Sequence, residues 1–167
     1  MPGTVVCRRV DPLSDALVDL SSLFEQYRIH YGRSPAPLAT LTWVSEMAAS
    51  GDLAFYGAHQ GSRMVGFAAV HTVPASLRLG RFWQLRDLFA DPGVRRQGIG
   101  RRLVETVRDA AGDAGAVRLS LQTEPDNLAA LALYRRCGLT VEADLTTLSV
   151  NLTPRPSGAP PEPILEE

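Results

Sequence analysis

The residues best suited to chemistry form a glycine-containing loop at 94–103, Val-Arg-Arg-Gln-Gly-Ile-Gly-Arg-Arg-Leu. Gly98 and Gly100 remove Cβ atoms where the chain enters a strongly amphipathic stretch that is typical of a helix. Backbone N–H groups at a helix start, with the helix dipole behind them, bind phosphate groups. The four arginines of the loop add positive charge. The pattern indicates a phosphate- or pyrophosphate-binding loop, although a plain loop beside a basic helix face has the same glycines.

Two other kinds of phosphate loop are excluded by the sequence. All 17 basic residues are Arg, so the Lys that a Walker-type loop requires is absent. The dinucleotide fingerprint needs a third glycine three residues after Gly100, where Leu103 stands. The absence of Lys also removes any Schiff-base nucleophile.

A second pair of polar residues, Asn127 and Tyr134, lies on a predicted helix at 127–137. They are two helical turns apart, so both side chains share one face. The helix follows a predicted strand, and ligands of such sheets collect at the carboxyl ends of the strands. Tyr134 is therefore a candidate functional residue, although a tyrosine on a helix face can equally be a core residue, and Asn127 can equally serve as the cap of its helix.

The elements around these residues alternate between two apolar patterns. Spacings of three and four predict helices at 12–31, 38–50, 99–114 and 127–137. Alternating or continuous apolar runs predict strands at 4–10, 53–59, 63–72, 82–90 and 116–123, with one or two more within 139–152. The order βααβββαβαββ predicts an α/β fold, with a mixed, mostly antiparallel central sheet of about seven strands and helices on both faces.

Length and composition agree with one globular domain. The 167 residues are 45% hydrophobic and 21% charged, close to the average of folded proteins. The formal net charge of −1 favours neither nucleic acid nor an anionic membrane as a partner. The first ten residues lack the apolar core of a signal peptide, and no apolar run is long enough to span a membrane. We therefore expect a cytoplasmic protein.

The domain is predicted to span residues 1–153 and to be followed by a tail at 154–167 that is rich in proline and glutamate. Proline fixes φ and lacks a backbone donor, so we expect this tail to be extended and disordered. Cys7 and Cys137 form no CxxC motif, and no His has partners at the spacing of metal ligands. No metal site is expected.

Two of these motifs together resemble those of the GNAT-type N-acetyltransferase superfamily. Its acyl-coenzyme A loop, R/Q-x-x-G-x-G/A, is matched by Arg95, Gly98 and Gly100. Its second motif, an Asn followed by Ala and then Leu-Tyr on a helix, is matched by residues 127–134. The resemblance covers residues 4–152, and the phrases LFEQYRIHYG and LRDLFADP are similar to the yeast Hpa-type group of acetyltransferases.

The resemblance implies acetyl-CoA as the cofactor and a specific place for it. The strand before the loop and the next strand would splay apart, and the pantetheine arm would pair with backbone groups of the first strand. The pyrophosphate would lie on the loop and the acetyl group near Tyr134. The implied cofactor-binding residues are Leu88, Phe89, Ala90, Arg95, Arg96, Gln97, Gly98, Ile99, Gly100, Arg101, Asn127 and Tyr134.

The implied reaction is direct transfer of the acyl group to an amine, without a covalent intermediate. A tyrosine, with a pKa of about 10, is suited to protonate the leaving thiolate, so Tyr134 is the predicted general acid. Some relatives have a Glu where Gln84 stands, and an amide cannot act as the base. Asp87, Glu124 and a chain of water molecules are the alternatives for that role.

The amine acceptor is expected between the first two predicted helices and the loop at 73–80. Aromatic rings beside a carboxylate suit a cationic amine. The candidates are Glu25, Tyr27, Tyr31 and Trp43, with His30 and Glu46 also available there, although the three aromatic ones can equally be core residues.

The predicted function is acetylation of a small amine, such as an amino acid, a polyamine or an aminated metabolite, by a monomer or homodimer. The alternatives are a protein lysine or N-terminal acetyltransferase and a non-catalytic acyl-CoA-binding module. Binding of nucleic acid through the arginine-rich helix at 95–108 is disfavoured, because the net charge is near zero and no aromatic residues are interleaved.

Overall fold

One five-stranded sheet forms the centre of the protein. The structure is a computed structural model, and it describes residues 4–94 and 96–152. The strands lie in the order β1-β2-β3-β4-β5, and every neighbouring pair is antiparallel except β4 with β5, which is parallel. The strands are β1 Val5–Arg9, β2 Ala54–Gln60, β3 Arg63–Ala75, β4 Gly80–Ala90 and β5 Leu119–Leu121. An α/β fold with a mixed sheet is thereby confirmed.

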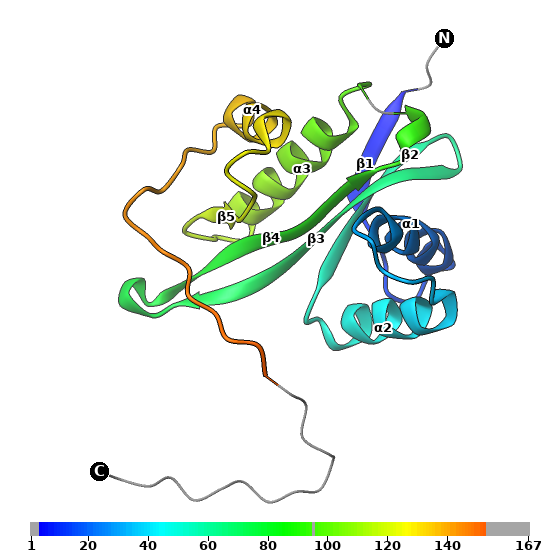
Figure 1. Ribbon diagram of the computed structural model, residues 1–167, viewed down its shortest axis with the longest axis horizontal. Helices are drawn as coiled ribbons and strands as arrows, with labels where there is room; N and C mark the ends of the chain where they lie inside the picture. The colour runs from blue at the N-terminus through cyan, green and yellow to red at the C-terminus, as the bar shows by residue number, and fades with distance from the viewer. Residues whose placement is uncertain (1–3, 95, 153–167) are drawn as a thin grey trace, which may run out of the picture.

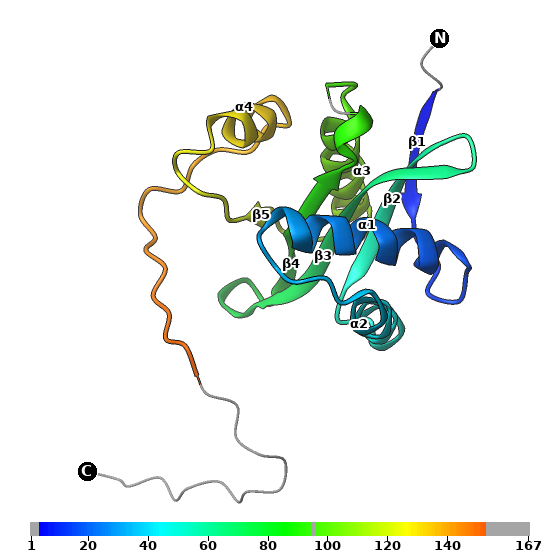
Figure 2. The same cartoon turned by 45° about the vertical axis from the view of Figure 1, so that its right-hand side comes forward.

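Helices cover both faces of this sheet, with α1 and α2 on one face and α3 and α4 on the other (Figures 1 and 2). The helices are α1 Ala16–His30, α2 Pro37–Ser50, α3 Ile99–Asp113 and α4 Leu128–Arg136, with short 3-10 helices at Ser76–Arg78 and Pro92–Val94. Gly51 and Gly138, both with positive φ, end α2 and α4 as the sequence predicts.

A separate apolar core lies on each face of the sheet. Ile99, Leu103 and Val107 of α3 are buried against one face, which confirms the stripe that the spacing predicts. The core beneath α1 is aromatic, and Phe24 stacks on Phe67 with ring centroids 5.2 Å apart. Because successive side chains of a strand point to opposite faces, a central strand must be apolar throughout, as the buried run Met64–Val70 of β3 is.

An irregularity in β4 decides where its side chains point. The consecutive residues 69 and 70 of β3 pair with Asp87 and Leu85, so Arg86 is the additional residue of a β-bulge. Without the bulge, Leu85 and Asp87 would face the same side of the sheet. With it, Leu85 packs in the core beneath α3, while Asp87 faces α1 and accepts a hydrogen bond from Tyr27.

The parallel pairing of β4 with β5 ends at the same place. It comprises three residue pairs, the last of which joins Leu85 to Leu121, while β4 itself runs on to Ala90. A bulge bends a strand and increases its twist. The two strands therefore diverge from Leu85 onward.

The end of the described chain differs from the prediction. Residues 139–152 are predicted to supply one or two strands, but they form no helix or strand, and the described residues contain five strands rather than about seven. A strand needs a neighbouring strand to complete its backbone hydrogen bonds, and residues 141–152 are exposed instead. The predicted order ended on these strands, so that order as a whole is not confirmed.

The structure tests the remaining predictions only in part. The predicted boundary at residue 153 and the tail at 154–167 lie outside the described residues. Both cysteines are free, and Cys137 is buried at the end of α4. No helix of the described chain is both long enough and apolar enough to cross a membrane.

Gly66 in β3 gives a direct test of how tightly the sheet packs. A Cβ at this position would lie 2.8 Å from the carbonyl oxygen of Phe89 and 2.9 Å from Cγ2 of Ile99. Because a backbone oxygen in a sheet cannot move aside, Gly66→Ala should lower the free energy of unfolding by about 1–3 kcal/mol. Urea denaturation measures the change.

Gly112→Ala on α3 is the matched control. A Cβ there would meet nothing within 4 Å, and Ala is favoured over Gly in a helix by about 1 kcal/mol. This variant should therefore be more stable than the wild type. A Gly66→Ala protein as stable as the wild type would contradict the close approach of β3, β4 and α3.

Candidate active site

A cavity of about 630 Å³ lies where β4 and β5 diverge. Residues of α1, β4, the start of α3, the segment after β5 and α4 line it. The fold therefore brings the glycine-containing loop and the asparagine–tyrosine helix, which are about thirty residues apart in the sequence, to one site.

The predicted site residues divide into two sets. Those that line the cavity are Tyr27, Tyr31, Leu88, Phe89, Ala90, Arg96, Gly100, Glu124, Asn127 and Tyr134. Those that lie elsewhere are Glu25, Trp43, Asp87, Gln97, Gly98, Ile99 and Arg101. Arg95 falls outside the described residues.

The glycine-containing loop leads directly into the N-terminus of α3. Gly98 precedes the first turn with φ of 75°, a conformation that favours glycine. Its carbonyl accepts a hydrogen bond from the Arg102 N–H at 3.0 Å, which fixes the first turn. A Cβ on Gly98 would meet nothing within 4 Å, so the space beside it is open. The first N–H groups of a helix have no partner within the helix, and here they border that open space.

The other loop residues have different positions. Arg96 lines the cavity and has a positive φ of 66°. Ile99 is 2% exposed and packs in the core, so only its backbone can face a ligand. Gln97 accepts a hydrogen bond from a glutamine of β2, and Arg101 forms an ion pair with a glutamate one turn later on α3. Within the described part of the loop, Arg96 is thus the arginine that lines the cavity.

Gly100 lies where α3 comes close to α4 and β4, and its φ is not positive. A Cβ there would lie 3.4 Å from Cδ2 of Leu133 on α4 and 3.8 Å from Cδ2 of Leu88 on β4. The missing side chain therefore lets α3 approach α4 and β4 at the edge of the cavity. Leu133 immediately precedes Tyr134 in the chain.

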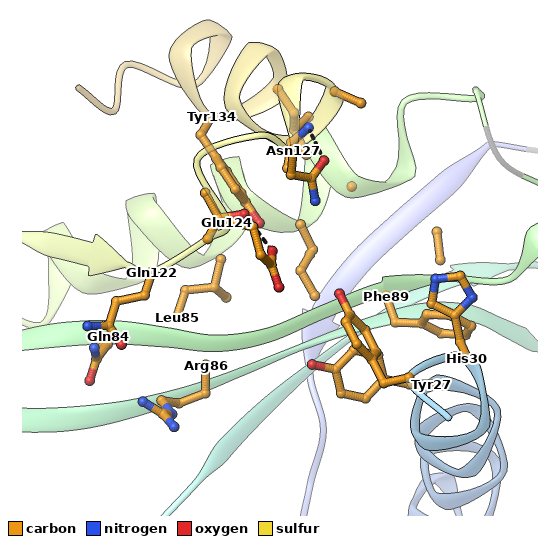
Figure 3. A pocket seen from close by; sticks show the side chains of 18 of the residues that line it. Tyr27, His30, Gln84, Leu85, Arg86, Phe89, Gln122, Glu124, Asn127 and Tyr134 are labelled. Atoms are coloured by element: carbon orange, nitrogen blue, oxygen red, sulfur yellow. Dashed lines mark hydrogen bonds between the residues drawn. The ribbon is translucent and has the colours of Figure 1, made fainter. Parts of the chain in front are cut away.

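Helix α4 carries Asn127 at its start and Tyr134 near its end. Asn127 caps the helix, because its Oδ1 accepts a hydrogen bond from the Ala130 N–H at 3.1 Å, and it also lines the cavity. Tyr134 points into the cavity (Figure 3). Burial raises the pKa of Tyr134, and the neighbouring Tyr31 and Glu124 raise it further. Its hydroxyl is therefore protonated at neutral pH, as a proton donor must be.

Glu124 points into the same space from the segment that follows β5 (Figure 3). Among the described residues that line the cavity it is the one carboxylate. Its carboxylate accepts a long hydrogen bond of 3.4 Å from the Thr123 hydroxyl. Its negative charge contributes to the raised pKa of Tyr134, so the two groups are electrostatically coupled.

Asp87 reaches the cavity only through Tyr27. The Tyr27 hydroxyl donates a hydrogen bond of 2.9 Å to Oδ1 of Asp87, across 60 residues of sequence. Burial raises the pKa of Asp87, while the bond from Tyr27 and the charge of Arg86 oppose that rise. Burial also raises the pKa of Tyr27 well above its ordinary value, and the charge of Asp87 adds to the effect. Nothing in the spacing of residues indicates this pair, because it depends on the bulge in β4.

Aromatic rings of α1 form the wall opposite α4. The rings of Tyr27 and Tyr31 meet edge to face with centroids 5.0 Å apart, and Tyr27 also contacts Phe89 at 5.8 Å. His30, which the sequence analysis places in the acceptor region, lines the cavity beside Phe89. It lies one helical turn after Tyr27, so the two side chains share a face of the helix.

The structure places Glu25 and Trp43 outside the cavity, contrary to the prediction. The Glu25 carboxylate accepts hydrogen bonds of 2.5 Å from the Ala36 N–H and the Thr40 hydroxyl, and one of 2.8 Å from Arg28. These bonds, first of all the one from Thr40, lower the pKa of Glu25. The same hydrogen bonds join the end of α1 to the start of α2 and so stabilise the connection between these two helices. Trp43 packs on a phenylalanine of α1 with ring centroids 5.4 Å apart.

Asp87→Asn should change how stability depends on pH. Because burial raises the folded-state pKa of Asp87 above its ordinary 3.8, its favourable contribution to folding is present below that value and is lost as pH rises through the folded-state pKa. Asn does not titrate and keeps an acceptor for Tyr27. The free energy of unfolding of Asp87→Asn relative to wild type should therefore increase from about pH 4 to about pH 7.

Urea denaturation at a series of pH values measures this difference. Asp113→Asn, at the exposed end of α3, is the control variant. A difference between Asp87→Asn and wild type that stays constant with pH would show that the folded protein does not desolvate the carboxyl.

The fold and the site together define the class of protein. Residues 17–139 match the acetyltransferase (GNAT) family, and the chain belongs to that family. An uncharacterised N-acetyltransferase of Bacillus subtilis is 29% identical over 139 residues, which cover 83% of this chain and 93% of that protein. IAA acetyltransferase of Azospirillum brasilense is 31% identical over 138 residues, which cover 83% and 85%. The crystal structure of a probable acetyltransferase is similar with a TM-score of 0.80 and 23% identity, over 91% of this chain and 99% of that one.

The protein is therefore an acyltransferase of the N-acetyltransferase type that depends on acetyl-CoA. The finer grouping with the yeast Hpa-type enzymes is not shown by these similarities.

Proposed function

We propose that the protein transfers an acetyl group from acetyl-CoA directly to the primary amine of a small molecule. The observation that carries the proposal is the cavity of about 630 Å³. The cavity lies where β4 and β5 diverge, and the start of α3 lines it together with the side chains of Tyr134 and Glu124. Cavities of this size accommodate small molecules.

One end of the cavity fits the coenzyme. Arg96 and Gly100 line the cavity at the N-terminus of α3, and this helix end together with the charge of Arg96 suits a pyrophosphate. Gly98 itself does not line the cavity, but it immediately precedes the helix and the space beside it is open. Residues 88–90 of β4, which follow the last pair with β5, would lie along the pantetheine arm. When bound, acetyl-CoA supplies an acetyl thioester, and transfer of its acetyl group to an amine releases the coenzyme as a thiol.

Tyr134 is the proposed proton donor to the leaving sulfur. Its hydroxyl points into the cavity (Figure 3), and burial keeps it protonated by raising its pKa. A donor must carry its proton at the working pH and release it only as negative charge develops nearby. Asn127 holds the first turn of α4 through its cap and so fixes the helix on which Tyr134 lies.

Glu124 is the proposed acceptor of the amine proton. An alkylammonium has a pKa of about 10.4, so only about one molecule in a thousand is neutral at pH 7. Glu124 points into the same space as Tyr134 and can attract the ammonium group and take its proton, directly or through water. Asp87 does not line the cavity. It is a positioning residue, which holds the Tyr27 hydroxyl by the bond of 2.9 Å.

The acceptor end of the cavity suits a small cation. The ring of Tyr27 stands opposite Glu124 (Figure 3), and Tyr31 lines the same cavity. Aromatic faces beside a carboxylate attract ammonium groups. Helices α1 and α4 bound this end on two sides. An acceptor end bounded by these two helices is the feature that leads us to propose a small amine rather than a segment of protein chain.

Thiol release from acetyl-CoA across a panel of amines tests the proposal. The panel contains amino acids, polyamines, aminated sugars and peptides that present either a lysine or a free N-terminus. Turnover with small amines is expected. Turnover with peptides alone would indicate a protein acetyltransferase instead, and binding of acetyl-CoA without any turnover would indicate a non-catalytic binding module.

Tyr134→Phe tests the proton donor. Phe keeps the ring and its packing but removes the proton, so kcat should fall by about 10²–10⁴, which is about 3–5 kcal/mol of barrier. The affinity for acetyl-CoA should change far less, because the hydroxyl acts in the transition state. Pre-steady-state rates at saturating amine separate chemistry from product release. A chemical step within a few-fold of wild type would refute this role.

Gly98→Glu tests the coenzyme end of the cavity. The variant adds bulk and negative charge beside the N-terminus of α3, so calorimetry should show that the affinity for coenzyme A is lost. Gly115→Glu is the matched control, because Gly115 also has positive φ and open space but follows the opposite end of α3. Equal affinities of the two variants would contradict the placement of the pyrophosphate.

A further inference from the structure

Arg86, the additional residue of the bulge in β4, carries a charge that has no ion-pair partner within residues 4–94 and 96–152. Its side chain is exposed, lines the cavity and makes no hydrogen bond with the described residues. The carboxylate of the adjacent Asp87 is bonded to Tyr27 instead. A bulge can redirect a side chain beside an active site, and here the redirected side chain is a cation.

The course of β4 separates Arg86 from the coenzyme end of the cavity. Ala90 lies four residues further on, which is about 13 Å in a strand, and Arg96 follows in the loop beyond Ala90. The proposed path of the pantetheine arm runs along residues 88–90, between these two arginines. Arg96 can therefore bind the pyrophosphate, whereas Arg86 lies beyond the acetyl end of the coenzyme, where the acceptor must approach.

The cavity offers one group of each charge to an acceptor. Arg86, Arg96 and Glu124 are the arginines and carboxylates among the described residues that line it. Figure 3 shows Arg86 on the side of β4 opposite to Leu85, toward α1, whereas Glu124 points into the cavity from the segment after β5. A polyamine would meet one carboxylate and be repelled by Arg86, whereas a molecule with an ammonium group and an anionic group would be attracted at both ends.

Gln84 adds neutral donors to this end of the cavity. It lines the cavity, and Figure 3 shows it at the same end as Arg86. Its Oε1 lies 2.8 Å from Nε2 of His71, the residue opposite it on β3. With the proton of His71 on Nε2, His71 donates this hydrogen bond, and the two N–H donors of the Gln84 amide are left for a ligand. A guanidinium and an amide together present donors that match the oxygens of a carboxylate.

We propose that the acceptor is an amino acid, whose carboxylate binds Arg86 and Gln84 while its amine approaches Glu124. This inference rests on the proposed function and names the substrate class within it. A guanidinium binds a carboxylate through two parallel hydrogen bonds, which orient the molecule as well as hold it. One arginine matches the single charge of a carboxylate better than the higher charge of a phosphate group. The bulge that turns Asp87 toward Tyr27 therefore also supplies the residue that selects the acceptor.

Thiol release from acetyl-CoA by the full-length protein tests this inference, with each of the common amino acids compared with its own carboxamide. The carboxamide keeps the size and the amine but removes the negative charge. Because hydrogen bonds to charged groups are strong, kcat/KM for the best amino acid should exceed that for its carboxamide by about 10–100-fold. The comparison is stringent, because a nearby carboxylate raises the pKa of the amine and so leaves the carboxamide with more of the neutral, reactive form.

Arg86→Gln should lower this ratio of acid to carboxamide by about 10–100-fold. Arg86→Lys should give an intermediate ratio, because it keeps the charge but loses the planar fork of the guanidinium. Arg81→Gln is the matched control, since Arg81 is exposed on the same strand but does not line the cavity, and it should leave the ratio unchanged. Both positions are exposed, so circular dichroism should show that each variant folds.

The outcomes separate this inference from the proposed function. Equal kcat/KM for acids and carboxamides, or a ratio that Arg86→Gln does not change, would overturn the inference while the proposed function stands. Faster turnover of spermidine or O-phosphoethanolamine than of every amino acid would do the same. No turnover with any small amine would refute the proposed function and this inference with it.

Discussion

One extra residue in β4, Arg86, ends the pairing with β5 and turns Asp87 onto the opposite face of the sheet. The parallel ladder with β5 stops at Leu85, the residue before Arg86, and the cavity lies where the two strands diverge. A regular strand would have pointed Asp87 toward α3, away from Tyr27. The edge of the cavity and the anchoring of its tyrosine wall thus meet at a single bulge.

The two faces of the sheet contribute different properties to the site. The face beneath α3 supplies a helix N-terminus and the helix that carries Tyr134, both fixed by aliphatic packing. The face beneath α1 supplies aromatic rings that belong at once to the core and to the cavity wall. A ring fixed in a core loses little freedom when a ligand arrives, so this wall is organised before binding.

Residues close together in sequence carried most of what could be predicted. Gly98 and Gly100 lie within one turn, and Asn127 and Tyr134 lie within one helix, so spacing indicates each pair. That the two pairs share one site was implied by the resemblance to the family. The hydrogen bond between Tyr27 and Asp87 could not be predicted, because it depends on a β-bulge that the apolar periodicity of the sequence does not indicate. Glu25 was predicted to bind substrate and does not line the cavity. A carboxylate among aromatic residues suggests a cation site, but donors of α2 and of the α1–α2 connection occupy the oxygens of this one. The apolar alternation at 148–152 is typical of a strand, yet whether a strand forms depends on a neighbour that the sequence does not name.

A substitution at Gly100 would affect two parts of the site at once. A Cβ at position 100 would already be in van der Waals contact with Leu133, so a longer side chain directed at Leu133 would push α4 away from α3, and Leu133 is joined covalently to Tyr134. In the proposed reaction, a displaced α4 would carry the phenol away from the sulfur, and the same side chain would disturb the proposed phosphate site at the N-terminus of α3, where Gly100 lies. In a mutational scan, substitutions at position 100 would lower both coenzyme binding and the rate of the proposed reaction, although Gly100 has no side chain that takes part in either.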